Sequence, residues 1–117
     1  MSKYSFSQSK RIKTDAHFQS LINHETKLVS KSFILYARLK EHDVQKIGFI
    51  ASKRIGNAVS RNKSKRKLKE VVRCYQYHIH KQYDIVLIAR QSIHTISYSD
   101  LCNEFINSIQ ELSIWID

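Results

Sequence analysis

One segment, residues 53 to 73, constrains the fold of this chain most, because it has a helical pattern but can be buried along only part of its length. It carries nine basic residues and a single acid, Glu70, a net charge of +8, while the rest of the chain carries only +2. Gly56 permits a tight bend and Asn57 is a preferred helix cap, so we expect a helix from Ala58 into the upper 70s. One element therefore holds most of the excess charge, and its partner is expected to be an anion.

The apolar face of this helix belongs to its second half, where five side chains share one arc: Leu68, Val71, Val72, Tyr75 and Ile79. In the first two turns the same arc meets Arg61, Ser64 and Lys65. Burying such groups without partners costs on the order of several kcal/mol each. We therefore expect the amino-terminal half of the helix to leave the core.

Beside the apolar face runs a polar and basic row that we call the basic strip: Asn62, Lys65, Arg66, Lys69 and Arg73. Like charges four residues apart cost about 0.2 to 0.5 kcal/mol per pair, and cations near a helix start oppose the helix dipole. Together these effects cost on the order of 1 to 3 kcal/mol, most of which a bound polyanion would reverse. The alternative is a merely solvated helix face, but such faces normally intersperse glutamates, which are almost absent here.

The rest of the chain predicts a sheet and two more helices within one domain, residues 1 to 117. Residues 1 to 13 are expected to form an extended arm, and residues 15 to 23 a helix capped by Thr14. Residues 28 to 40 predict a short strand and a longer one, residues 46 to 52 an internal strand, and residues 83 to 90 another strand. "SYSD", residues 97 to 100, is a capping-box pattern before a helix with this apolar stripe: Leu101, Phe105, Ile109 and Leu112.

The two cysteines, Cys74 and Cys102, form no CxxC pair, so we expect neither a disulfide framework nor a zinc ribbon, and a reducing cytoplasm fits best. Cys74 and His78 stand four residues apart, but two ligands do not make a structural metal site. The chain contains no apolar run of signal-peptide or membrane-span length, so we expect a soluble protein that is not exported.

A protein nuclease would need positioned carboxylates, a histidine pair or a metal cage to activate water. The ten acids are scattered and the six histidines lack an obvious orienting carboxylate. We therefore expect no catalytic residue in this chain.

The stretch "SKRIGNAVSRNKSKRKLKE", residues 52 to 70, resembles the signature segment of the bacterial ribonuclease P protein component. "HFQSLI", "FILYARL" and "DIVLIAR" extend the resemblance over nearly the whole chain, while the last helix matches in pattern more than in sequence. The resemblance implies an α+β fold, a small two-layer α/β sandwich of order α-β-β-β-α-β-α with a left-handed βαβ crossover, ribosomal protein S5 domain 2-like. Such a crossover departs from the general right-handed rule.

The resemblance also implies partners and an activity. The chain would bind the catalytic RNA of ribonuclease P one to one, as a monomer or with weak self-association, and the precursor tRNA whose 5′ leader the RNA removes. The enzyme is then an endoribonuclease, a hydrolase whose catalytic centre and Mg²⁺ ions belong mainly to the RNA and substrate. RNA binding is assigned to the basic segment: Lys53, Arg54, Arg61, Asn62, Lys63, Lys65, Arg66, Lys69 and Arg73. The resemblance places Phe18, Tyr36 and Arg90 near a cleft for the single-stranded leader.

Physical chemistry supports these roles and leaves alternatives for two of them. Arginine makes forked contacts with phosphate oxygens, and lysine supplies a mobile charge. Tyr36 is suited to stacking on an unpaired base, or is a half-buried sheet tyrosine. Phe18 shares a face with apolar neighbours and is also a candidate core residue. Lys63 stands where the family has an arginine, and Ile22 where a second aromatic is frequent.

Two other classes of protein share this charge pattern. A basic ribosomal or ribosome-assembly protein would need no leader cleft. A DNA-binding regulator would place the basic helix in a major groove, but neither a dimer seam nor a recognition-helix turn is evident.

Overall fold

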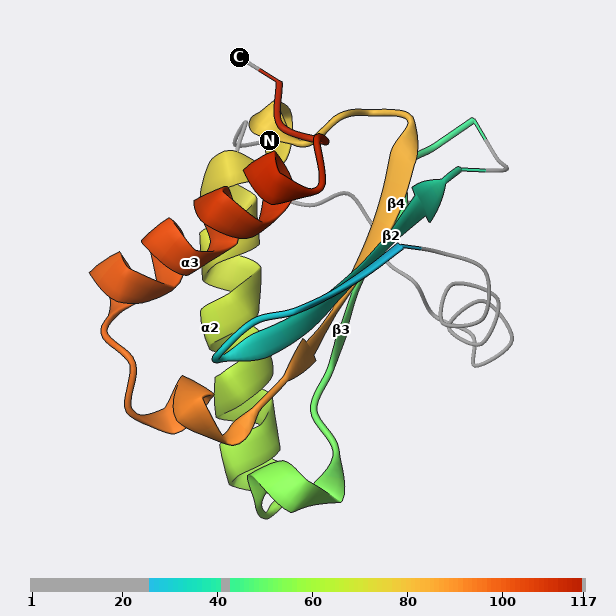
Figure 1. Cartoon of the computed structure of the whole chain (residues 1–117). Coiled ribbons are helices and arrows are strands. Elements are labelled where there is room, and N and C mark those ends of the chain that lie inside the picture. The colour runs from blue at the N-terminus through green and yellow to red at the C-terminus, as the bar shows by residue number, and fades with distance from the viewer. Residues whose placement is uncertain (1–25, 41–42, 117) are drawn as a thin grey trace.

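The computed structural model describes residues 26 to 40 and 43 to 116 (Figure 1). The helix and the arm expected before residue 26, with Phe18, lie outside the described residues. The described elements follow the expected order of three strands, a helix, a strand and a helix. They are β1 (Thr26–Val29), β2 (Phe33–Leu39), β3 (Ile47–Ile50), α2 (Ala58–Tyr75), β4 (Tyr83–Ala89) and α3 (Tyr98–Glu111). Short 3-10 helices connect them: η2 (Lys53–Ile55), η3 (Gln76–His78) and η4 (Gln91–His94).

The four described strands form one sheet in the order β1-β2-β4-β3. β2 pairs antiparallel with β1 and with β4, whereas β3 and β4 are parallel and α2 connects them. The prediction that residues 46 to 52 form an internal strand is wrong, since β3 lies at the edge of this sheet. An apolar pattern on both faces reports burial of the faces, and Ile47 and Gly48 are indeed buried, but it says nothing about how many neighbours a strand has.

Both helices cover the same face of the sheet (Figure 1). This face contributes Phe33, Leu35 and Ala37 from β2 and Ile85, Leu87 and Ala89 from β4 to one apolar cluster. The predicted apolar faces of the helices fill the same cluster, with Leu68, Val71 and Val72 from α2 and Leu101, Phe105 and Ile109 from α3. The result is the predicted two-layer α+β arrangement.

The second half of the basic helix is shorter than predicted. α2 ends at Tyr75, η3 adds one tight turn, and Ile79 then forms a bridge with Trp115 near the carboxyl terminus. Ile79 is buried as expected, but through this pairing and not as part of a helical face. Neither described helix is long and apolar enough to cross a bilayer.

Candidate nucleic-acid interface

The start of α2 is built as its sequence predicts. Gly56 has φ 141°, a conformation that side chains beyond glycine rarely adopt, and an added Cβ would lie 3.0 Å from Cβ of Ser60. Asn57 caps the helix, because its Oδ1 accepts a hydrogen bond of 2.9 Å from the backbone nitrogen of Ser60. The tight bend therefore turns the chain from η2 directly into the basic helix.

The first turns of α2 leave the core only in part. Asn62, Lys63 and Arg66 are exposed, whereas Arg61 and Lys65 are half-buried. Ser64 is buried, contrary to the expectation that this end of the apolar arc stays out of the core. The buried hydroxyl keeps a hydrogen-bond partner, because Ser64 Oγ donates to the backbone oxygen of Ser60 at 2.9 Å.

Arg61 is a half-buried cation in the first two turns of α2. Its Nε is shielded from solvent and has no hydrogen-bond partner within residues 26 to 40 and 43 to 116. A buried donor without an acceptor is unfavourable, and a phosphate oxygen would satisfy it. This atom is therefore suited to an anionic partner that approaches α2.

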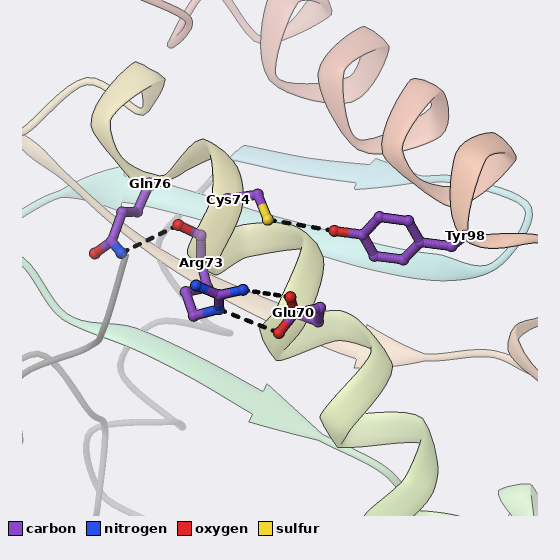
Figure 2. A network of polar contacts seen from close by, with 5 residues as sticks. All are labelled: Glu70, Arg73, Cys74, Gln76 and Tyr98. Atoms are coloured by element: carbon purple, nitrogen blue, oxygen red, sulfur yellow. Dashed lines mark hydrogen bonds and ion pairs between the residues drawn. The ribbon is translucent and has the colours of Figure 1, made fainter. Parts of the chain in front are cut away.

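In the described part of the chain, Lys67 and Arg73 contact other groups of the protein, and sequence reasoning identified neither contact. Lys67 Nζ donates to the backbone oxygens of Ile93 at 2.8 Å and Ile96 at 3.2 Å, so it fastens α2 to η4 and the loop that follows. Arg73, an assigned RNA-binding residue, forms an ion pair with Glu70 one turn earlier (Figure 2). The Arg73 hydrogen bonds lower the pKa of the Glu70 carboxyl from its usual value.

η2 and η4 are joined by side chains that donate to backbone oxygens. His94 Nε2 donates to the oxygen of Ile55 at 2.8 Å, and Gln91 Nε2 donates to the oxygen of Arg54. Arg54 thereby lies beside Arg90, the residue that follows β4. The assigned Arg54 and Arg90 thus reach the same end of the sheet.

A cleft of about 450 Å³ opens at this end of the sheet. Three cations and several apolar side chains line it: Val29, Lys31, Ile34, Ser52, Arg54, Ile55, Ile88, Ala89, Arg90, Gln91 and Ser92. Arg90 is held at its rim, because one guanidinium nitrogen donates to the backbone oxygen of Ser30 at 2.6 Å. Apolar walls with cationic rims suit a nucleotide strand, which presents bases and phosphates together.

Tyr36 lies on the sheet face that continues from this cleft. It packs with Ile50, Val86 and Ile88, and Lys27 Nζ is 5.9 Å from the centre of its ring. Tyr36 does not line the cleft itself, but Ile34, two residues earlier on the same face of β2, does. Of the three residues assigned to the leader, the structure thus brings two to one side of the sheet, while Phe18 lies outside the described residues.

In the described part of the chain, no group of three or more His, Cys, Asp or Glu side chains is arranged to hold a metal ion. Cys74 and His78, the pair noted from the sequence, have other contacts. Cys74 Sγ lies 3.3 Å from the Tyr98 hydroxyl, and His78 donates from Nδ1 to the backbone oxygen of Ile116 at 3.0 Å. Both cysteines are free thiols.

Comparison with known proteins agrees with this arrangement. Residues 6–113 match the family described as Ribonuclease P. Curated relatives named ribonuclease P protein component include one from Syntrophomonas wolfei, 31% identical over 90% of this chain and 88% of its own length, and one from Clostridioides difficile, 30% identical over 95% and 98%. The solved structure of Staphylococcus aureus RNase P protein is 30% identical, covers 92% of this chain and 98% of its own, and superposes with a TM-score of 0.79. The family match spans most of the chain and includes the whole basic helix, so this chain belongs to the ribonuclease P protein family.

Proposed function

We propose that the exposed first turns of α2 bind the catalytic RNA of ribonuclease P, and that the cleft at the end of the sheet holds the 5′ leader of precursor tRNA. The protein then assists endonucleolytic removal of the leader, which gives the mature 5′ end of the tRNA. The observation that carries this proposal is the position of the cations. Arg61, Asn62, Lys63 and Arg66 lie on turns of α2 that contribute only Ser64 to the core.

The geometry supports a protein that positions RNA and leaves the chemical step to its partner. Positively charged side chains reduce phosphate repulsion between the two RNAs, and Mg²⁺ bound mainly by RNA and substrate activates the water. Arg54 and Arg90 line the cleft together with apolar side chains of the sheet, which supports its assignment to the leader. We propose a one-to-one complex in the cytoplasm, with the free protein monomeric or weakly self-associating.

A charge-matched pair of variants tests the RNA-binding face. Replacing Arg61 and Arg66 by glutamine removes two positive charges from α2. The control is the double variant Asn103→Asp, Gln110→Glu, which also lowers the net charge by two but does so at exposed positions of α3. The assay is single-turnover cleavage of precursor tRNA by a bacterial ribonuclease P RNA at low Mg²⁺, with substrates that have a long leader or none.

We expect wild type and control to stimulate cleavage in a leader-dependent manner, and the α2 variant to lose the stimulation. The slope of log affinity against log salt should fall by about 1.4 to 1.8 in the α2 variant, because each of the two lost phosphate contacts contributes about 0.7 to 0.9. Equal stimulation by the α2 variant and the control would refute the assigned face. Stimulation that ignores the leader would refute the cleft and favour a basic RNA-binding protein of another kind.

A further inference from the structure

A second pocket lies at the opposite end of α2 from the basic turns and from the leader cleft. It has a volume of about 310 Å³ and is lined by Lys40, Asp43, Val44, Gln45, Gln76, Tyr77 and Lys81. None of these residues belongs to the interface proposed above. The pocket contains two lysines, an aspartate, an aromatic ring and two buried carboxamides, of which that of Gln45 donates to the backbone oxygens of His80 and Tyr83.

The carboxamide of Gln76 is the unusual feature of this pocket. The side chain is only 3% exposed, and its Nε2 donates to the backbone oxygen of Arg73 at 3.1 Å. This bond fixes the orientation of the amide, because a backbone carbonyl accepts a hydrogen bond only from the nitrogen. Figure 2 shows Oε1 turned away from the Arg73 carbonyl, and this oxygen has no hydrogen-bond partner in the described part of the chain. A buried acceptor without a donor is unfavourable, and a donor from a bound molecule would satisfy it.

The pocket walls provide the other two elements that bind a nucleotide. Tyr77 is 45% exposed, and an exposed aromatic side chain is suited to stacking on a base. Lys81 is exposed, and Lys40 is positioned by a 2.8 Å hydrogen bond from Nζ to the backbone oxygen of Asp43. Two ammonium groups beside an aromatic ring match the phosphate and the base of one nucleotide.

The pocket also continues the basic strip. Along α2 the strip ends at Arg73, and Gln76 and Tyr77 follow three and four residues later, the spacing of neighbours on one helix face. The strip from Asn62 to Arg73 is about 16 Å long at 1.5 Å per residue. An RNA strand that follows it therefore arrives at the pocket on the next turn.

We propose that this pocket binds one unpaired nucleotide of the RNA that lies along α2, with a base that carries an exocyclic amino group. The base stacks on Tyr77, its amino group donates to Gln76 Oε1, and Lys40 and Lys81 contact the adjacent phosphates. Adenine and cytosine present such an amino donor, at N6 and N4, and uracil does not. This inference rests on the proposed RNA-binding role of α2 and adds a site of base recognition to it.

Binding of fluorescein-labelled 12-nucleotide single-stranded RNAs to the full chain tests the proposal by fluorescence anisotropy. The RNAs contain only adenosine, only uridine, or only purine riboside, a purine nucleoside that lacks the amino group. We expect the wild type to bind the first RNA about 2- to 10-fold more tightly than the other two, the range of one hydrogen bond. Tyr77→Ala should weaken binding of the first RNA at least about 5-fold, and Tyr77→Phe should not.

Three further variants make the outcome specific. Tyr98→Ala removes a tyrosine of nearly equal exposure, 46%, on α3 and should bind as wild type. Gln76→Met, checked for folding by its thermal transition, should bind the adenosine and purine riboside RNAs equally. The Arg61→Gln, Arg66→Gln variant should bind every RNA more weakly.

Normal binding by that last variant would refute the proposed role of α2. If the Arg61→Gln, Arg66→Gln variant binds weakly but Tyr77→Ala binds as wild type, the pocket is refuted while the proposed role of α2 stands. Equal wild-type affinity for all three RNAs would also overturn it, and that comparison needs no change in the protein.

Discussion

Arg66 and Lys67 are adjacent cations of one helix, and the structure predicts opposite consequences when each is replaced by methionine. Arg66 is exposed and belongs to the basic strip. Lys67 Nζ donates to the backbone oxygens of Ile93 and Ile96 and joins α2 to η4. Arg66→Met should therefore impair RNA binding and spare stability, whereas Lys67→Met should impair stability and spare RNA binding.

The two magnitudes follow from the contacts. A hydrogen bond from a charged group contributes about 1.5 to 3 kcal/mol, and of the two bonds the one to Ile93 is the shorter, so we expect Lys67→Met to cost about 2 kcal/mol in total. For a chain of 117 residues this lowers Tm by about 8 °C. Arg66→Met removes one phosphate contact and should lower the slope of log affinity against log salt by about 0.7 to 0.9.

Thermal unfolding followed by circular dichroism and a salt titration of RNA affinity measure both quantities on the same samples. Since both variants lose one positive charge from neighbouring positions, a difference between them cannot come from net charge. The reasoning is refuted if Lys67→Met unfolds at the wild-type temperature, or if its salt slope falls as far as that of Arg66→Met. The first result would mean that the Lys67 bonds contribute nothing measurable to stability, and the second would mean that Lys67 contacts RNA.

Three further predictions concern the ends and the neighbours of α2. Asn57→Ala removes the cap and should lower the free energy of unfolding by about 1 kcal/mol. Urea denaturation should show a lower midpoint at an unchanged m value, and an unchanged midpoint would show that the cap is not needed. Glu70→Gln removes the acid paired with Arg73 and should steepen the salt slope of RNA binding by up to about 0.9, whereas a flatter slope would contradict a role for Arg73. Burial, with hydrogen bonds to Cys74 and Cys102, raises the pKa of the Tyr98 hydroxyl, so the folded state favours the protonated form and stability should fall as pH rises above about 10. Tm measured from pH 8 to 11 should fall less steeply in Tyr98→Phe, and identical profiles would contradict this assignment.

Local sequence patterns predicted the elements whose signals are local. Gly56 and Asn57 set the start of α2 through their own backbone conformation and one capping bond, and Ser97 caps α3 by accepting from the backbone nitrogen of Asp100 at 3.1 Å. The alternation from Phe33 onward gives β2 one buried face along its first five residues, and the helical spacing of Leu101, Phe105 and Ile109 gives α3 its buried face. These features need no knowledge of distant residues.

Features that depend on distant residues were missed or predicted wrongly. β3 has the composition of an interior strand, but β4, more than thirty residues later, takes the interior position beside β2. Ile79 continues the helical pattern of α2, yet its partner is Trp115 near the carboxyl terminus. Periodicity measures which face is buried, and it contains no information on which segment buries it.

The candidate site shows the same division within one helix. Nine basic residues were visible in the sequence, but Lys67 differs from Arg66 because η4 and the loop that follows it each present a backbone oxygen to Lys67. Ser64 was expected to be exposed because a buried hydroxyl needs an acceptor, and the helix supplies one itself at Ser60. Gln76 carried no signal at all, since a glutamine at the end of a helix is ordinary and its unpaired oxygen appears only in the folded chain.

These contacts also change the explanation of how α2 tolerates its charge. Repulsion among the cations costs on the order of 1 to 3 kcal/mol, and RNA can relieve it only after binding. Besides the Arg73–Glu70 ion pair, two contacts in the described part of the chain oppose this cost in the free protein: the Asn57 cap, about 1 kcal/mol, and the Lys67 bonds to Ile93 and Ile96, about 2 kcal/mol. The cost of the repulsion and the stabilisation from these contacts are of similar size, so α2 can be fully formed before RNA arrives. A preformed helix loses little conformational entropy on binding, and the phosphate contacts then contribute to affinity instead of to folding.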